Sequence, residues 1–169
     1  TSNKEFIIPR SSGYIGVLID DLVTKGTKEP YRMFTSRSEY RLLLRADNAD
    51  LRLTPFGIDV GCVDTDRQRE FEKKSKRIKD GFKFVKNHKF SPDALLKKGI
   101  KINKDGKKRN IIDLLSFSNI TTPKLKKILP ELNDLEDDVM EQIEIEAKYA
   151  GYLDRQRMDI QDFEKEENL

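Results

Sequence analysis

Apolar residues recur at helical spacing near the start of the chain. Ile15, Leu18, Ile19 and Leu22 stand three or four positions apart, or side by side, and Gly26 follows them. This is the spacing of one face of a helix, and glycine is the usual residue just beyond a helix C-terminus. The pattern predicts a first helix over roughly residues 13–24, and a strand is also compatible with it.

A short helix is predicted after Ser36. Ser36 and Glu39 stand three residues apart, which is the spacing of an N-terminal capping box. The helix would carry Tyr40, Leu43 and Leu44 on one face. Its other face would present arginines at every fourth position, namely Arg37, Arg41 and Arg45.

A turn-rich break and a second short helix come next. Residues 47–50 read Asp-Asn-Ala-Asp, which indicates a break and a domain junction. Thr54 then offers an N-cap, with Pro55 in the first helical position and Gly61 as the stop.

A longer helix is predicted after Asp64, which can cap its N-terminus. Its apolar residues are separated by steps of seven, four and three, which is typical of a helix that packs along a narrow seam. They are Phe71, Ile78, Phe82 and Val85. Lysine and arginine cover the remaining faces, and we interpret residues 73–86 as mainly a solvated surface that could add non-specific attraction for phosphates.

Proline, asparagine and glycine divide the rest of the chain into short helices and loops. Ser91-Pro92 starts a helix that Gly99 ends, and residues 103–110 form a polar, lysine-rich loop around an Asp105-Gly106 turn. Asn110 can cap a further helix. Thr122-Pro123 can cap another, which Pro130 stops.

A last, long helix is predicted from Leu135 to Phe163. Val139, Ile143, Ala147 and Ala150 recur at helical spacing. The small residues Ala147, Ala150 and Gly151 would let a neighbouring helix approach closely. The sequence therefore predicts a mostly α-helical fold, with a helix bundle in its later part.

Composition supports helices and limits the function. Of 169 residues, 36% are hydrophobic and 37% are charged, so apolar positions must form narrow stripes. The net charge of +3 is too small to predict a nucleic-acid binder by itself, but basic residues dominate 73–109 and acidic ones dominate 131–146. The longest apolar runs are too short to span a bilayer, so no membrane contact is expected.

The residues that usually carry catalysis form no recognisable set. There is no glycine-rich phosphate loop, and one Cys with one His excludes an internal disulfide and a typical zinc site. We interpret Cys62 as a buried or half-buried side chain, and a Cys62–His88 catalytic pair has no supporting motif. Asp20 and Asp21 point to different helix faces and are expected to be solvated or paired with arginine. We predict no catalytic and no metal site.

Five arginines lie close together in the first part of the chain. They lie within 21 residues that also hold Phe34 and Tyr40, directly after Tyr31, and are Arg32, Arg37, Arg41, Arg45 and Arg52. Guanidinium groups bind phosphates through two hydrogen bonds and stack on bases, which suits RNA. The alternative is that Arg41 or Arg45 forms internal ion pairs with Asp47, Asp50 or Asp20. These residues alone leave both interpretations open.

Several segments resemble one known family. They are EPYRMFTSRSEYR at residues 29–41, RADNADLRLT at 45–54, YIGVLIDDLVTKG at 14–26 and IEAKYAGYLDRQ at 145–156. Taken in their order along the chain, these segments resemble the MnmG (GidA) family of FAD-dependent proteins that modify tRNA at uridine. The resemblance is weak over residues 91–130, where only the rhythm of short helices is similar.

The resemblance implies a domain division and a cofactor. Residues 1–55 would be the C-terminal end of an FAD-binding domain, and 56–169 would form a truncated helical C-terminal domain. The family's glycine-rich FAD motif and reactive cysteines lie upstream, so FAD is expected only in the full-length protein and this chain alone should be inactive. The family implies the bacterial cytoplasm or the mitochondrial matrix as the location.

The resemblance also implies partners. Full-length members modify the wobble uridine of tRNA together with an MnmE-type GTPase, and a homodimer is expected. The five arginines become candidates for tRNA contacts. Candidates for contact with the GTPase or tRNA are Tyr149, Tyr152, Arg155 and Gln156 on the last helix. The alternative is a purely structural scaffold or dimerisation segment.

Overall fold

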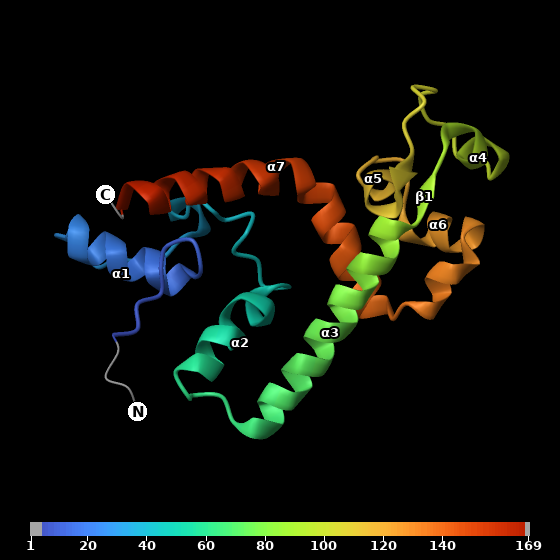
Figure 1. The fold of residues 1–169 in the computed structure, drawn as a ribbon. Coiled ribbons are helices and arrows are strands. Elements are labelled where there is room, and N and C mark those ends of the chain that lie inside the picture. Colours follow the sequence, from blue (N-terminus) through green and yellow to red (C-terminus); the bar gives the residue numbers. More distant parts are fainter. Residues whose placement is uncertain (1–4, 168–169) are drawn as a thin grey trace. The chain divides into compact units, whose positions relative to one another are not determined.

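The computed structural model describes residues 5–167 (Figure 1), and most of them are helical. The mostly α-helical fold predicted from the sequence is confirmed. The elements in chain order are α1 (Tyr14–Thr24), η1 (Thr35–Arg37), α2 (Ala49–Asp59), α3 (Thr65–Asn87), β1 (Lys89–Phe90), α4 (Pro92–Lys97), β2 (Arg109–Asn110), α5 (Ile111–Leu115), α6 (Thr122–Ile128), η2 (Pro130–Asp134) and α7 (Asp137–Glu167). Among these residues no helix combines the length and the apolar character that crossing a membrane requires.

The chain forms two compact units. The first unit holds the described residues up to Glu72 together with those from Tyr152 onward, and the second unit is Lys73–Gly151. The long helices α3 and α7 each run from one unit into the other. The first unit is therefore discontinuous in sequence, whereas the second is one uninterrupted segment.

Leucine and isoleucine fill the core of the second unit. The stripe predicted on α3 is confirmed here, because Ile78 and Val85 are buried and Phe82 is half-buried. Burial of such side chains is the main favourable contribution to folding. The other fully buried positions are Leu95, Ile100, Ile111, Leu114, Leu115, Ile120, Leu125, Leu132, Met140, Ile143 and Ala147.

Helix α7 packs closely against α3 at Gly81. A Cβ atom added to Gly81 would overlap Cγ1 of Val139. The sequence placed the close approach at Ala147, Ala150 and Gly151. Ala147 is buried, but a Cβ on Gly151 would meet nothing within 4 Å, so that part of the prediction is wrong.

Three predicted helix caps are confirmed. The side chain of Asp64 accepts a hydrogen bond from the Arg67 backbone N–H at 2.8 Å, and Ser91 accepts one from Ala94 at 3.2 Å. Asn110 and Asp113 form a reciprocal capping box, with both hydrogen bonds at 2.9 Å. Helix α6 begins one residue earlier than predicted.

The cap of α6 is displaced because Thr122 has another partner. Thr121 occupies the N-cap and makes no side-chain capping bond. The hydroxyl of Thr122 instead donates to the Glu144 carboxylate on α7. Thr122 therefore joins two helices of the second unit.

The helix predicted after Ser36 does not form. Thr35–Arg37 is a single 3₁₀ turn, and Ser38 has extended backbone with φ −94° and ψ 123°. The Glu39 carboxylate, which a capping box would direct to the backbone, forms an ion pair with Arg10 at 2.6 Å. The arginine stripe expected on that helix is therefore absent, and Tyr40 begins a turn that its carbonyl closes with Leu43 and Leu44.

Helix α2 also differs from the prediction. It begins at Ala49 and contains Pro55 in its interior, although the sequence placed Pro55 at its first position. Asn48 holds the early start, because its side chain donates to the Leu43 carbonyl at 3.0 Å and accepts from Arg52 at 2.8 Å. These bonds, four and five residues apart in sequence, fix the start of the helix upstream of Pro55, where one helical hydrogen bond is lost.

Helix α1 lies where the pattern predicted it, but most of the residues that gave the pattern are exposed. The exposed fractions are 48% for Ile15, 52% for Ile19 and 37% for Leu22. The buried side of the helix holds Gly16, Val17 and Asp21. An apolar groove of about 630 Å³ lies in this unit, lined among others by Ile8, Ile19, Val23, Ile160 and Phe163.

Candidate nucleic-acid interface

The five arginines of the cluster separate into two groups. Arg45 and Arg52 are partly buried and bonded to the backbone of the first unit, whereas Arg32, Arg37 and Arg41 are exposed. Arg45 forms one of the internal ion pairs that the sequence left open, and Arg32, Arg37 and Arg41 remain candidates for contact with RNA.

Arg45 and Arg52 connect the start of α2 to the preceding chain. Arg45 pairs with Asp47 at 2.9 Å and donates to the Leu42 carbonyl at 2.8 Å. Arg52 donates to the carbonyl of Ser12, to that of Arg45 at 3.1 Å and to the Asn48 side chain. Burial and the nearby Arg45 charge lower the pKa of Arg52 from its usual value. These two arginines satisfy carbonyl groups inside the unit.

Arg37 is exposed but held in place. Its Nε donates to the Arg32 carbonyl at 3.1 Å, and its guanidinium carbon lies 4.5 Å from the centre of the Tyr31 ring. Arg32 lies over the Phe34 ring in the same way, at 5.3 Å. Cation–π contacts of this kind leave the guanidinium N–H groups at the ring edge and in solvent.

Arg41 is the least constrained member of the cluster. It is exposed, and within residues 5–167 its side chain forms no hydrogen bond or ion pair. A solvated guanidinium can turn toward a phosphate without first giving up a partner.

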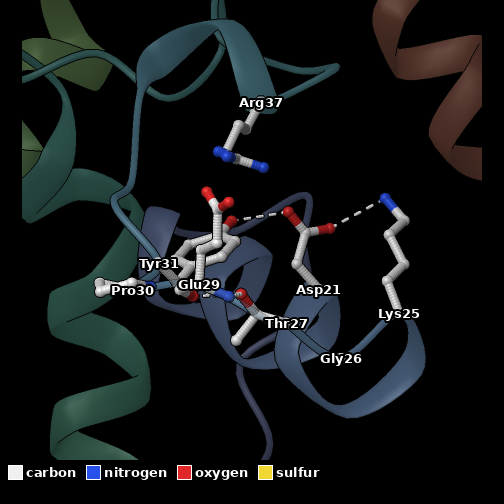
Figure 2. A pocket seen from close by; sticks show the side chains of 8 residues that line it. All are labelled: Asp21, Lys25, Gly26, Thr27, Glu29, Pro30, Tyr31 and Arg37. Carbon is white, nitrogen blue, oxygen red and sulfur yellow. Dashed lines mark hydrogen bonds and ion pairs between the residues drawn. The ribbon is translucent and has the colours of Figure 1, made fainter.

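A buried carboxylate positions Tyr31 beneath Arg37 (Figure 2). Asp21 is 5% exposed and accepts from the Tyr31 hydroxyl at 2.6 Å, from Arg10 at 2.8 Å and from Lys25 at 3.0 Å. The hydrogen bond from Tyr31, followed by those from Arg10 and Lys25, holds the pKa of Asp21 well below its usual range. The same bond raises the pKa of Tyr31.

These groups line a small polar pocket of about 190 Å³ in the first unit. Figure 2 shows Asp21 and Tyr31 pointing toward each other, with the Arg37 side chain directed toward them from the η1 segment. Its lining carries two carboxylates and two cations, so it has no net charge to select an anion. The lining residues are Asp21, Lys25, Gly26, Thr27, Glu29, Pro30, Tyr31 and Arg37.

Sequence inspection missed Arg10, which joins three carboxylates. Its guanidinium bonds Asp20 at 2.7 Å, Asp21 at 2.8 Å and Glu39 at 2.6 Å. Burial opposes its charge, but the hydrogen bonds with Glu39, Asp21 and Asp20 outweigh burial and raise the pKa of Arg10. The expectation that Asp20 and Asp21 pair with arginine is confirmed. No periodicity links Arg10 to partners this distant in sequence.

The four residues singled out on the last helix have different environments. Tyr149 is 37% exposed, Tyr152 is 63% exposed and Arg155 is exposed. Gln156 is half-buried, and its amide donates to the Glu39 carbonyl at 3.0 Å. Gln156 therefore connects α7 to the segment that follows η1 within the first unit.

Cys62 lies in the first unit and His88 in the second. Cys62 is exposed, so the prediction of a buried or half-buried thiol is wrong; it follows Gly61, whose φ of +76° turns the chain out of α2. Nδ1 of His88 lies 2.8 Å from the Phe84 carbonyl, within hydrogen-bond distance. In the part of the chain that the structure describes, no three His, Cys, Asp or Glu side chains are arranged to hold a metal ion.

The profile of the tRNA modifying enzyme MnmG/GidA C-terminal helical domain matches residues 65–157, which is more than half of the chain. The chain belongs to the MnmG/GidA family. Its residues 65–157 correspond to the family's C-terminal helical domain, which confirms the resemblance seen in the sequence.

Three bacterial relatives share the printed name tRNA uridine 5-carboxymethylaminomethyl modification enzyme MnmG. The protein of Granulibacter bethesdensis is 43% identical over 96% of this chain, that of a Nitratiruptor species is 43% identical over 94%, and that of Caldicellulosiruptor saccharolyticus is 44% identical over 96%. The match covers 26% of each relative. The chain thus spans about a quarter of the length of these MnmG proteins.

Solved structures of the family have the same fold in the matching region. GidA of Aquifex aeolicus in its form II crystal is 33% identical with a TM-score of 0.76, covering 96% of this chain and 25% of that one. The form I crystal gives 32% identity and a TM-score of 0.71, covering 95% and 24%.

Proposed function

We propose that the chain is the tRNA- and partner-binding C-terminal part of an MnmG-type flavoprotein that modifies wobble uridine with a 5-carboxymethylaminomethyl-type group. The observation that carries the tRNA contact is the exposed group Arg32, Arg37 and Arg41, which lies within ten residues of chain. Arginine forks match phosphate oxygens and guanidinium planes stack on bases. We infer that the nucleic acid is tRNA because the chain belongs to a family of tRNA-modifying enzymes.

The five arginines divide their tasks in this proposal. Arg32, Arg37 and Arg41 contact the tRNA backbone, and Arg37 is pre-positioned by Tyr31 and the Arg32 carbonyl. Arg45 and Arg52 do not contact the tRNA. They hold the backbone that carries this surface in place by donating hydrogen bonds to carbonyl groups. A guanidinium that is already held loses less conformational freedom on binding.

The FAD of the full-length protein would be bound outside this chain. Residues 1–55 would complete the FAD-binding domain and 56–169 would begin the helical C-terminal domain. Within residues 5–167 the strands are β1 and β2, of two residues each, and neither leads through a glycine-rich turn into a helix N-terminus. The described residues therefore do not fit a dinucleotide phosphate, and no chemical step is assigned to them.

Contact with an MnmE-type GTPase is assigned to the exposed residues of α7. Tyr149, Tyr152 and Arg155 offer aromatic and guanidinium groups, the side chains that protein interfaces favour. Gln156 supports this surface through the Glu39 carbonyl. A homodimer would form in the full-length protein.

A salt titration against unmodified tRNA tests the proposal. The affinity of the wild-type chain should fall steeply with salt, and Arg41→Ala should reduce the slope of log affinity against log salt by about 1. Arg67→Ala is the matched control, because Arg67 is also exposed in the first unit and its side chain forms no bond with the described residues.

Equal slopes for wild type, Arg41→Ala and Arg37→Ala would contradict the proposed arginine contacts. Absence of tRNA binding by the folded wild-type chain would favour the scaffold alternative. In that case the bonds of Arg45 and Arg52 would represent the main role of the cluster.

A further inference from the structure

One short segment of the second unit, between α4 and β2, carries a high positive charge. Residues 97–109 contain six lysines, one arginine and one aspartate, which is a net charge of +6. The whole chain has a net charge of +3, so all other residues together are net negative. We refer to residues 97–109 as the lysine segment. Residues 73–86 also carry a net charge of +6, so the basic part of the chain extends over both segments, and its positive potential favours an anionic partner.

The lysine segment is attached to the core at several points. Leu95 just before it and Ile100 within it are 0% and 1% exposed. Strands β1 and β2 pair antiparallel, with Phe90 opposite Arg109, and this fixes the point where the segment returns (Figure 1). The segment therefore has a defined position on the second unit.

A carboxylate organises the turn in the middle of the lysine segment. Asp105 accepts from the Lys107 backbone N–H at 3.1 Å and from Arg109 at 2.8 Å, and Gly106 follows with a φ of +73°. The bond from Arg109, then that from Lys107, lowers the pKa of Asp105 to about 2. The segment's one carboxylate is thus occupied by Arg109 and does not pair with its lysines.

Four lysines of the segment are exposed, and their side chains form no hydrogen bond or ion pair with residues 5–167. They are Lys97, Lys101, Lys107 and Lys108. The other two have partners, since Lys98 donates to the Ile128 carbonyl at 3.2 Å and Lys104 pairs with Asp93 at 3.1 Å. Four solvated ammonium groups therefore lie along about a dozen residues of chain.

We propose that the lysine segment is a second RNA-binding surface, which contacts the sugar-phosphate backbone without reading its sequence. This rests on the proposed tRNA binding and extends it to the second unit. Lysine acts as a point charge toward phosphate and forms no paired hydrogen bonds, so the contact is sequence-independent. The regularly spaced phosphates of an RNA backbone also suit the exposed lysines, which are spread along the segment.

An acidic protein surface is the other anionic partner to consider. Protein interfaces have an apolar or aromatic centre and few lysines. The apolar side chains of the lysine segment are Ile100, which is buried, and Ile102, which is half-buried. The segment exposes no apolar centre, and the observations favour RNA.

Two RNA probes separate this proposal from the arginine contacts. Polyuridylate tests binding to phosphates in the absence of a folded tRNA. Unmodified tRNA tests binding by the lysine segment and by the exposed arginines. The variant replaces Lys97, Lys101, Lys107 and Lys108 by Gln. The control replaces Lys89, Lys124 and Lys127 by Gln, because these lysines are exposed in the same unit but lie outside residues 73–86, and their side chains have no bonding partner among the described residues.

Fluorescence anisotropy is measured over a range of salt concentrations for both probes, after circular dichroism shows equal helicity. Each lost contact with single-stranded RNA lowers the slope of log affinity against log salt by about 0.7, so the variant should lose roughly 2 to 3 in slope. The control should lose less than half of that. Arg37→Ala/Arg41→Ala should weaken binding of tRNA more than binding of polyuridylate.

Equal polyuridylate slopes for wild type and variant would overturn the lysine segment as an RNA surface, whatever the arginine variants do. Equal losses in variant and control would overturn it as well, since they would show a general charge effect. A loss confined to the lysine variant supports it, and unchanged tRNA binding in the arginine variants would then contradict only the proposed arginine contacts.

Discussion

Gly81 on α3 faces Val139 on α7 at a distance that leaves no room for a methyl group on the glycine. Gly81→Ala would force the valine or one helix to move. We expect the clash to cost about 1–3 kcal/mol, which exceeds the gain of about 1 kcal/mol that alanine brings to a helix. Urea unfolding followed by circular dichroism measures the net loss.

Gly151→Ala is the matched control for this substitution. Gly151 also lies inside a helix, but a Cβ there would meet nothing within 4 Å. Only the gain in helix propensity should remain, about 0.5–1 kcal/mol of added stability. If both variants shift the unfolding midpoint in the same direction, the packing at Gly81 tolerates an added methyl group and the predicted clash is wrong.

Arg52→Lys should destabilise the first unit. A lysine can reach one of the three oxygen atoms on Ser12, Arg45 and Asn48 that now accept from Arg52. Leaving partly buried acceptors without donors costs about 1–3 kcal/mol. Arg41→Lys keeps the charge at a solvated site and should change stability by less than about 0.5 kcal/mol. Thermal unfolding of the two variants compares them directly.

Acid should weaken the first unit through Asp21. Its pKa is lower in the folded chain than in the unfolded one, so the folded state is favoured while the carboxylate is ionised. This stabilisation is complete above the unfolded pKa of about 4 and is lost as the pH falls below it. Asp21→Asn should unfold more readily at neutral pH and show a flatter dependence between about pH 5 and pH 2. An unchanged acid profile in this variant would show that other carboxylates control it.

Asn110→Ala should remove the capping box at the start of α5. The change deletes the bond to the Asp113 backbone N–H and should cost about 1 kcal/mol. Thr121→Ala provides the comparison, because Thr121 occupies an N-cap without a side-chain capping bond. A loss of similar size in both variants would mean that the cost arises from the substitution itself and not from the cap.

Local signals predicted the second unit well. Capping residues, glycine stops and the apolar stripe of α3 act over a few residues, and their partners lie within the same turn or on the facing helix. For this reason Ser91, Asn110 and Gly99 mark real helix ends, as Asp64 does in the first unit. Family segments added what local patterns could not, since no periodicity points to tRNA.

Side-chain bonds that no spacing rule describes explain the main errors in the first unit. The Ser36–Glu39 spacing failed because Arg10, distant in sequence, takes the Glu39 carboxylate. The start of α2 was misplaced because buried Asn48 bonds Leu43 and Arg52. The arginine cluster could be found from the sequence, but its division into internal and exposed members depends on neighbours that no spacing rule identifies.

The discontinuous first unit has a consequence for biosynthesis. Its α7 portion, with fully buried Leu153 and with Gln156 bonded to the Glu39 carbonyl, comes after the entire second unit in the chain. A ribosome therefore delivers all of Lys73–Gly151 before the earlier residues receive their last helix. Domains that fold during translation usually complete in N- to C-terminal order. Here the order of completion is reversed: the later segment can close first, and the arginines of the first unit must wait until α7 has been synthesised.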